Sequence, residues 1–221
     1  MLTGLLGGSF NPAHGGHRRI TRFTIDALGL DEAWWLVSPG NPLKPKAGMA
    51  PLSARLRSAY AQAKRAPIIP TAIESELRTR YTVDTLRELQ NRYKSRQFVW
   101  LMGSDNLAQF HRWKDWRTIA RTMPIAVIAR PGYTRDAMTS PAMAWFRRYT
   151  VSVPAFRKLG RNGLGRAPAL VLLHFDPDHR SATAIRRNES DWADQYGNTR
   201  VLRDRLTHQL IKSGQIKDLD A

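Results

Sequence analysis

The 221-residue chain contains no cysteine, which excludes disulfides, thiolate nucleophiles and cysteine-based zinc sites. Long apolar runs are lacking as well, since no stretch approaches the roughly 20 apolar residues that a membrane-spanning helix needs. The first strand-like run begins at Leu2, which leaves no room for a signal peptide. From these absences we expect a cytoplasmic protein without a membrane partner.

Acidic residues are scarce: 18 Asp and Glu stand against 35 Lys and Arg, a formal net charge of +17. A basic surface attracts nucleic acid, but it also steers phosphorylated small molecules toward a site. The basic residues are spread along the whole chain rather than gathered in one arm. This distribution favours substrate steering, and we expect no nucleic-acid partner despite the charge.

Short apolar runs are the main secondary-structure signal. Five of them predict buried strands, and residues 68–70 are a further short strand candidate. Segments with the apolar spacing of helices, among them residues 52–63, lie between the strands. The strand-like runs are residues 2–6, 33–38, 98–102, 124–129 and 170–175. Strands that alternate with helices predict an α/β fold with a doubly wound parallel sheet.

Three segments carry weaker signals. Residues 74–80 have mixed charges and predict a loop. Residues 133–168 are the least informative, and we expect a variable peripheral segment there. Apolar residues between 201 and 211 have amphipathic spacing and predict a terminal helix that covers the sheet.

The most informative stretch is residues 7–20, GGSFNPAHGGHRRI. Gly7 and Gly8 follow a strand-like run and let the backbone turn and approach a ligand. A helix is expected after the next glycine pair, and its free N–H groups and positive end would face an anion. His14 and His17 are three apart, so on one helical turn they project to the same side. Taken singly, a glycine pair or a histidine near a turn is more often structural, whereas together they fit a phosphate clamp.

This stretch resembles the signature of the nucleotidyltransferase superfamily, which shares a His-x-Gly-His motif with class I aminoacyl-tRNA synthetases. The longer form Gly-Gly-Ser-Phe-Asn-Pro-x-His-x-Gly-His is most similar to bacterial nicotinate-nucleotide adenylyltransferases, with Ala13 where a bulkier residue is expected. Residues 181–186, SATAIR, match the superfamily's second signature, although Arg180 precedes them in place of an apolar residue. Ser181 alone would pass for a helix N-cap, but two signatures in the right order argue against coincidence.

The resemblance implies a single Rossmann-like domain over residues 1–221 that transfers AMP from ATP to nicotinate mononucleotide, giving deamido-NAD and pyrophosphate. His14 and His17 would hold the α- and β-phosphates, while Arg186, Ser181 and Thr183 would hold the β/γ end. Mg²⁺ would bridge the phosphates, held by phosphate and water, since the sequence offers no metal-ligand cluster. The full set expected to bind ATP is Gly7, Gly8, Ser9, Phe10, His14, His17, Gly103, Asp105, Ser181, Thr183 and Arg186.

The residues expected to bind the acceptor substrate rest on the same resemblance. They are Asn41, Lys44, Thr82, Thr85 and Trp113. Each has a plain structural reading, because loop lysines are usually solvated, threonines at a helix start can cap it, and a tryptophan can belong to the core. The resemblance favours site roles: the threonines against the mononucleotide and the indole stacked on the pyridine ring.

Other functions stay open at this point. A related enzyme of the same fold could use nicotinamide mononucleotide, phosphopantetheine or a cytidylyl acceptor. A basic RNA-binding protein of the synthetase type is permitted by the charge, but 221 residues leave no room for an anticodon-binding domain. A non-catalytic nucleotide sensor would be expected to lose His17 or Arg186, and both are present. The sequence leaves a homo-oligomer open.

Overall fold

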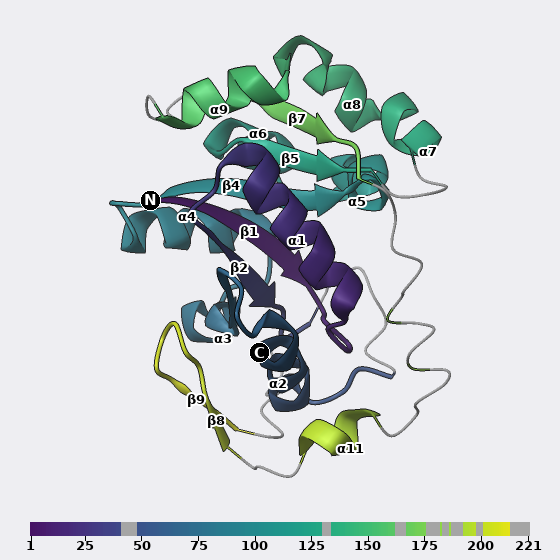
Figure 1. The fold of residues 1–221 in the computed structure, drawn as a ribbon. Helices are drawn as coiled ribbons and strands as arrows, with labels where there is room; N and C mark the ends of the chain where they lie inside the picture. The colour runs from purple at the N-terminus through teal and green to yellow at the C-terminus, as the bar shows by residue number, and fades with distance from the viewer. Residues whose placement is uncertain are drawn as a thin grey trace. The chain divides into compact units, whose positions relative to one another are not determined.

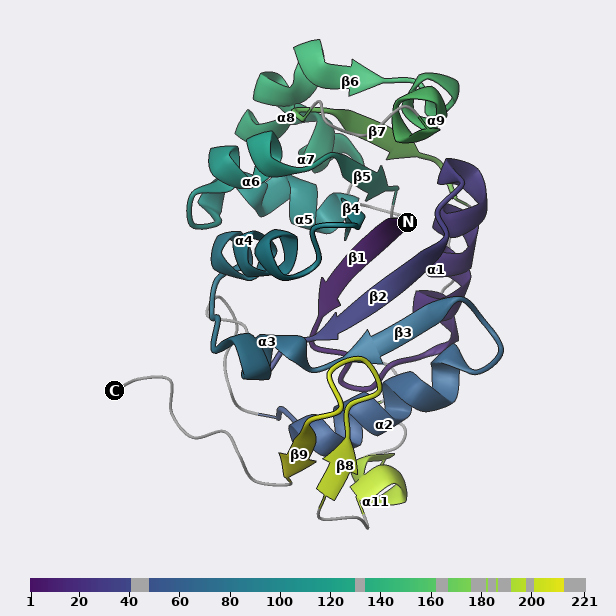
Figure 2. The same ribbon diagram turned by 90° about the vertical axis from the view of Figure 1, so that its left-hand side faces the viewer.

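The computed structural model describes residues 1–40, 48–129, 134–161, 167–175, 182, 186, 192–197 and 201–212. Seven strands form one sheet with the order β3-β2-β1-β4-β5-β7-β6 (Figures 1 and 2). The pairs β1–β4, β4–β5, β5–β7 and β6–β7 are all parallel. The strand order reverses between β1 and β4, as in Rossmann-like folds. The expected α/β class with a doubly wound parallel sheet is confirmed.

The contacts divide the chain into two compact units, residues 1–6, 22–33 and 81–177, and residues 7–21, 34–80 and 178–221. Strand β1 (Leu2–Gly8), helix α1 (Gly15–Leu28) and strand β2 (Glu32–Val37) contribute residues to both units. The single-domain organisation expected from the sequence stays a prediction.

The first unit holds the β4–β5–β7–β6 part of the sheet. In β1, Leu2 to Leu6 pair in register with Gln97 to Leu101 of β4. All four residues of β5 are buried, as expected for a strand covered on both faces. The further elements of the first unit are α4 (Thr82–Arg92), β4 (Gln97–Gly103), α5 (Ser104–Gln109), the 3₁₀ turn Phe110–Arg112, α6 (Trp116–Thr122), β5 (Ile125–Ile128), α7 (Thr134–Thr139), α8 (Pro141–Phe146), the 3₁₀ turn Arg147–Tyr149, β6 (Thr150–Val151), α9 (Val153–Arg161) and β7 (Leu170–Leu173).

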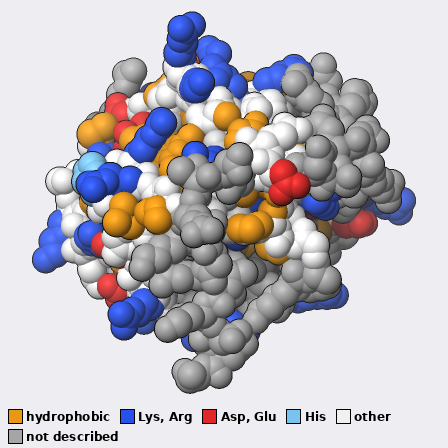
Figure 3. Space-filling view, turned by 90° about the horizontal axis from the view of Figure 1, so that it is seen from below, with side chains coloured by type: hydrophobic (Ala, Val, Ile, Leu, Met, Phe, Trp, Pro, Cys, Tyr) orange, Lys and Arg blue, Asp and Glu red, His pale blue; other side chains and the backbone are white. Residues whose placement is uncertain are grey.

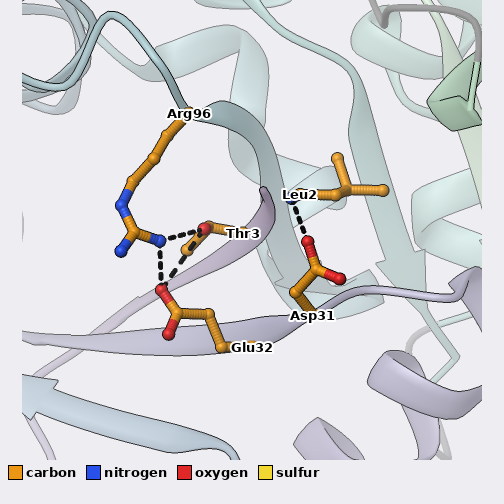
Figure 4. A network of polar contacts seen from close by, with 5 residues as sticks. All are labelled: Leu2, Thr3, Asp31, Glu32 and Arg96. Carbon is orange, nitrogen blue, oxygen red and sulfur yellow. Dashed lines mark hydrogen bonds and ion pairs between the residues drawn. The ribbon is translucent and has the colours of Figure 1, made fainter.

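Polar side chains from neighbouring segments form hydrogen bonds with residues at the amino end of β1 (Figure 4). The Arg96 guanidinium donates to the Thr3 hydroxyl at 3.0 Å and forms an ion pair with Glu32. The side chains of Arg96 and Glu32 are only 21% and 12% exposed. The Leu2 backbone N–H donates to an Asp31 carboxylate oxygen at 2.7 Å. Arg96 and Glu32 are thus largely withdrawn from solvent and paired with each other, while Asp31 is exposed and accepts a backbone N–H.

The second unit is built around helix α2, and α11 packs against it. Leu52, Leu56 and Ala59 give α2 a buried stripe, and the helix spans the expected range 52–63. The elements of this unit are α2 (Leu52–Ala63), β3 (Ile68–Thr71), α3 (Ile73–Leu77), α11 (Trp192–Gly197), β8 (Val201–Arg203) and β9 (Leu210–Lys212).

Two expectations about this unit were wrong. The segment expected to be a loop over residues 74–80 begins with helix α3, because fully buried Ile73 anchors its first turn and Arg78 ends it in the left-handed conformation. The expected terminal helix is instead an antiparallel hairpin, in which β8 pairs with β9. The fully buried Asp204 carboxylate accepts the backbone N–H groups of Leu206 and Thr207, which fixes a turn in the middle of the segment.

Residues 134–161, within the segment expected to be variable and peripheral, form α7, α8, β6 and α9. Helices α7 and α8 pack against α5, and β6 lies at the edge of the sheet. Whether the segment varies among relatives stays a prediction.

The surface agrees with the charge of the sequence. On the face seen in Figure 3, Lys and Arg side chains are scattered among apolar ones, with few Asp and Glu between them. In the described part of the chain, no helix combines the length and apolarity required to cross a membrane.

Candidate nucleotide-binding site

The two glycines of the first motif are not the turn that the sequence predicts. Strand β1 continues through Gly7 and Gly8, and the turn follows at residues 11–12. A Cβ atom on Gly8 would lie 3.3 Å from the Phe10 ring, tighter than an ordinary contact. The missing side chain of Gly8 therefore serves the close approach of an aromatic ring rather than a reversal of the backbone.

Phe10 supports the site from within the core. Its backbone has a φ of 46°, a left-handed conformation that is uncommon for a bulky residue. The ring is 2% exposed, stacks on Trp35 with centroids 5.1 Å apart, and lies 4.9 Å from the His17 ring. The Trp35 indole N–H in turn donates to the Thr21 hydroxyl at 2.9 Å. Because the Phe10 ring is buried in this way, it packs against His17 and sets where that imidazole lies.

The two histidines of the motif lie side by side. His14 immediately precedes α1 and His17 is the third residue of the helix, so only His17 lies within its first turn. Their ring centroids are 3.9 Å apart. The two rings therefore lie side by side, although His14 is not on the helical turn from which the sequence expectation was argued.

Backbone hydrogen bonds define the proton position on both imidazoles. The His14 backbone N–H donates to His17 Nδ1 at 3.2 Å, and the Gly16 N–H donates to His14 Nδ1 at 3.1 Å. An Nδ1 that accepts a hydrogen bond carries no proton, so the proton of the neutral ring lies on Nε2. Both rings therefore present an Nε2–H donor, which is the group a phosphate oxygen needs.

The arginine of the second signature contacts the first. Arg186 Nη1 donates to the Asn11 backbone carbonyl at 2.5 Å. The Asn11 side chain is tied down as well: its Nδ2 donates to the Gly48 carbonyl at 2.9 Å and its Oδ1 accepts the Ala50 N–H at 3.2 Å. The structure thus brings Arg186 to the loop that carries the histidines. Ser181 and Thr183, which are expected to act with Arg186, lie outside the described residues. Asn41 and Lys44, the loop residues expected to bind the acceptor, lie outside them as well.

Arg55 was not expected from the sequence. It lies in the first turn of α2, is fully buried, and donates to the backbone carbonyls of Ser9, Ser38 and Ala50. Burial lowers the pKa of Arg55 to about 10, and the charge of Glu74 partly opposes that shift. One sequence signal could have pointed to it, namely an arginine between Leu52 and Leu56 on the apolar stripe of a helix.

The remaining expected ATP-binding residues lie at the end of β4, in the first unit. Gly103 is the last residue of β4 and the N-cap of α5, and no side chain caps this helix end. Asp105 is the second residue of α5 and is half-buried. Asp105 is therefore not the N-cap residue of α5.

The expected acceptor-binding residues of the same unit lie near the start of α4 and after the 3₁₀ turn at residues 110–112. Thr82 is the first residue of α4, whose N-cap is Tyr81, so capping does not explain Thr82. Thr85 is 1% exposed and its hydroxyl donates to the Tyr81 carbonyl at 3.3 Å. Trp113 is half-buried and meets Phe110 edge-on, with ring centroids 5.2 Å apart. Their contacts with a substrate stay predictions.

The second unit thus carries two imidazole donors and an arginine on one loop and helix start. A strand, a turn and a helix start in this order are a common setting for anion binding in α/β proteins. No group of three or more His, Asp or Glu that could hold a metal ion occurs among the residues that the structure describes.

Comparison with known proteins identifies the family. The chain belongs to the cytidylyltransferase-like family, whose sequence profile matches residues 5–188. A probable nicotinate-nucleotide adenylyltransferase of Erythrobacter litoralis is 66% identical over 209 residues, 95% of this chain and 94% of the relative. One of Parvibaculum lavamentivorans is 51% identical over 186 residues, 84% of this chain and 91% of the relative.

Solved structures agree on the fold. The nicotinic acid mononucleotide adenylyltransferase of Plasmodium falciparum, complexed with NaAD, has a TM-score of 0.62 at 15% sequence identity. The likeness covers 84% of this chain and 82% of that one. At this identity the likeness concerns the fold alone.

Proposed function

We propose that this chain is a nicotinate-nucleotide adenylyltransferase, which transfers AMP from ATP to nicotinate mononucleotide in NAD biosynthesis. The products are deamido-NAD and pyrophosphate. The observation that carries the proposal is the pair of Nε2–H donors on His14 and His17, in a chain 66% identical over 95% of its length to a protein of that name.

The chemistry needs positioning more than proton transfer. The attacking phosphate of the acceptor is already an anion near neutral pH, so no general base is required. An oxygen of that phosphate bonds to the α-phosphorus of ATP while the bond to the bridging oxygen breaks and pyrophosphate leaves. The barrier comes from bringing polyanions together and from the charge that develops on the transferring and leaving groups.

The residues of the second unit take roles that follow from their donors. His14 and His17 donate from Nε2 to the α- and β-phosphates. Arg186 carries a guanidinium, which suits bidentate contact with the phosphates that leave as pyrophosphate. The hydrogen bond from Arg186 Nη1 to the Asn11 carbonyl holds the guanidinium beside the histidine-bearing loop.

Mg²⁺ belongs to the proposal as the companion of ATP. The side chains just described offer N–H donors to phosphate oxygens, and phosphate and water oxygens are the ligands that Mg²⁺ prefers. When bound, the ion neutralises phosphate charge. The cytoplasmic location and the acceptor contacts of Thr82, Thr85 and Trp113 stay predictions.

The test is pyrophosphate release from ATP and Mg²⁺ with nicotinate mononucleotide and nicotinamide mononucleotide side by side. We expect a strong preference for the acid and loss of release when EDTA removes the metal. Equal or better use of the amide would overturn the acceptor assignment. Release with neither would overturn the proposed function.

A further inference from the structure

Two side chains of helix α2 form hydrogen bonds with the motif loop, and an arginine of α1 just after the loop donates to the end of α2. Arg55 Nη1 donates to the Ser9 carbonyl at 2.8 Å, which lies at the start of the loop. The Ser58 hydroxyl accepts the Ala13 N–H at 3.1 Å, one residue before His14. Beyond the loop, Arg18 of α1 donates to the Gln62 and Lys64 carbonyls at 2.8 and 2.6 Å.

Arg55 also connects that loop with two other segments. Its Nη1 donates to the Ser38 carbonyl at 2.6 Å, just after β2, and its Nε donates to the Ala50 carbonyl at 2.9 Å, just before α2. A longer contact of 3.4 Å reaches the Pro39 carbonyl. A planar guanidinium can fix several acceptors in different directions at once, which a lysine ammonium on a flexible stem cannot do.

The absence of an ion pair on Arg55 is informative. Charged side chains are almost never fully buried unless they are paired. Arg55 is fully buried, yet among the described residues it forms no ion pair, and its hydrogen bonds all go to backbone carbonyls. Burial lowers its pKa, although the nearby charge of Glu74 partly opposes that shift. Its hydrogen bonds therefore fix the positions of these backbone carbonyls.

The position of the Ser9 carbonyl matters to the histidines through Phe10. Ser9 directly precedes Phe10, whose left-handed backbone turns its ring under His17 at 4.9 Å. At the other end of the loop, the Ser58 hydroxyl that accepts the Ala13 N–H itself donates to the Arg55 carbonyl at 2.7 Å. Residues at both ends of the loop therefore form hydrogen bonds with side chains from the same turn of α2.

We propose that Arg55 is a positioning residue for adenylyl transfer, which holds the loop over residues 9–13 in the conformation that aims His14 and His17 at the phosphates of ATP. This inference rests on the proposed function. Arg55 touches neither substrate nor reacting atoms, and it acts through the Ser9 carbonyl and the Phe10 ring.

The experiment compares Arg55→Lys and Arg55→Met with wild type at a temperature where circular dichroism shows all proteins to be folded. ATP is varied at saturating nicotinate mononucleotide. We expect kcat/KM for ATP to fall about 100-fold in Arg55→Met, since misplacement by about 1 Å can cost that much, and to be partly restored in Arg55→Lys. A role in stability alone would lower Tm and leave kcat/KM of the folded enzyme unchanged.

Arg96→Lys and Arg96→Met are the matched controls, because Arg96 is also largely buried but pairs with Glu32. They should lower Tm and keep kcat/KM for ATP within about twofold of wild type, well below the effect of a misplaced group. If Arg55→Met fails to fold, Arg55→Lys and Ser58→Ala decide the matter by the same kinetics. Wild-type kcat/KM in folded Arg55 variants, or an equal loss in the Arg96 variants, overturns the proposal.

Failure of the proposed function would be visible separately, as a wild-type protein that releases no pyrophosphate. In that case the Kd for ATP, measured by calorimetry, replaces kcat/KM. Weaker ATP binding in the Arg55 variants and not in the Arg96 variants would still support the positioning role. Equal binding in all variants would overturn it.

Discussion

Arg96 and Arg55 are both withdrawn from water, but they are used differently. Near the amino end of β1, Arg96 is paired with Glu32, and the neighbouring Asp31 accepts the Leu2 N–H (Figure 4). Beyond the carboxyl end of β1, the hydrogen bonds that Arg55 makes with the described residues go to backbone carbonyls, next to a loop with two imidazoles. The Arg96–Glu32 ion pair stabilises the fold, whereas the Arg55 guanidinium holds backbone segments in place beside the candidate site.

The largest effect expected from this difference is on catalysis by His17. His17→Ala removes the Nε2–H donor that the proposed function assigns to a phosphate, and loss of one such preorganised donor typically costs about 100- to 1,000-fold in kcat. Steady-state pyrophosphate release measures it, with circular dichroism to confirm folding. His174→Ala, at an exposed position, is the control and should retain wild-type turnover. Wild-type turnover in folded His17→Ala would contradict the assignment of His17 as a phosphate ligand.

A buried carboxylate in the second unit should behave as Glu32 does and serve the fold. Asp204 accepts the Thr71 hydroxyl and the N–H groups of Ala72, Leu206 and Thr207. Asp204→Asn replaces one carboxylate oxygen with an NH₂ group, which would face the hydroxyl and N–H donors that the oxygen had accepted. We therefore expect the free energy of unfolding to fall by about 2 kcal/mol. Urea unfolding measures this change. A loss of kcat/KM for ATP in the folded variant would contradict the division between fold and site.

The fit of Phe10 against Gly8 should affect activity more gently. In Gly8→Ala the new methyl group lies 3.3 Å from a ring held between Trp35 and His17, so the ring must shift by a few tenths of an ångström. We expect kcat/KM for ATP to fall about tenfold, less than for a full ångström of misplacement. In Gly40→Ala the added Cβ has nothing within 4 Å, and kinetics should be unchanged. Equal kinetics in the two variants would show that the Gly8 contact is immaterial.

The smallest effect is expected at the amino end of β1. Glu32→Gln leaves the Arg96 guanidinium with a neutral acceptor, and we expect the free energy of unfolding to fall by about 1 kcal/mol, between the values of exposed and buried pairs. Denaturant titration measures it. Turnover at 25 °C should not change, and a lowered kcat/KM would place this network in the catalytic machinery.

The sequence predicts the parts of this molecule that depend on local pattern. The apolar runs of β1, β2, β4 and β5, the helical stripe of α2 and the spacing of His14 and His17 all led to the observed elements. The local sequence pattern gave the wrong secondary structure where a contact with residues distant in sequence determines the conformation. The apolar positions of residues 201–211 suit a helix as well as a hairpin, and buried Asp204, bound to Thr71 and Ala72, favours the hairpin.

The candidate site shows the same limit. The motif identifies the histidines, but the role of Arg55 depends on Ser9 and Ser38, which are 46 and 17 residues away and contact the same guanidinium as nearby Ala50. Likewise, Gly8 looks like a turn residue in sequence, and its contact with Phe10 depends on the left-handed backbone of that residue.

The most direct test of the account is a crystal structure with Mg²⁺ and an ATP analogue that cannot be cleaved between the α- and β-phosphates. We expect phosphate oxygens within hydrogen-bond distance of Nε2 of His14 and of His17, with the Arg186 guanidinium on the β- or γ-phosphate. The Arg55 contacts with Ser9, Ser38 and Ala50 should be retained. Phosphates bound away from the histidines, or an Nε2 turned from them, would contradict the assignment of this loop as the nucleotide site.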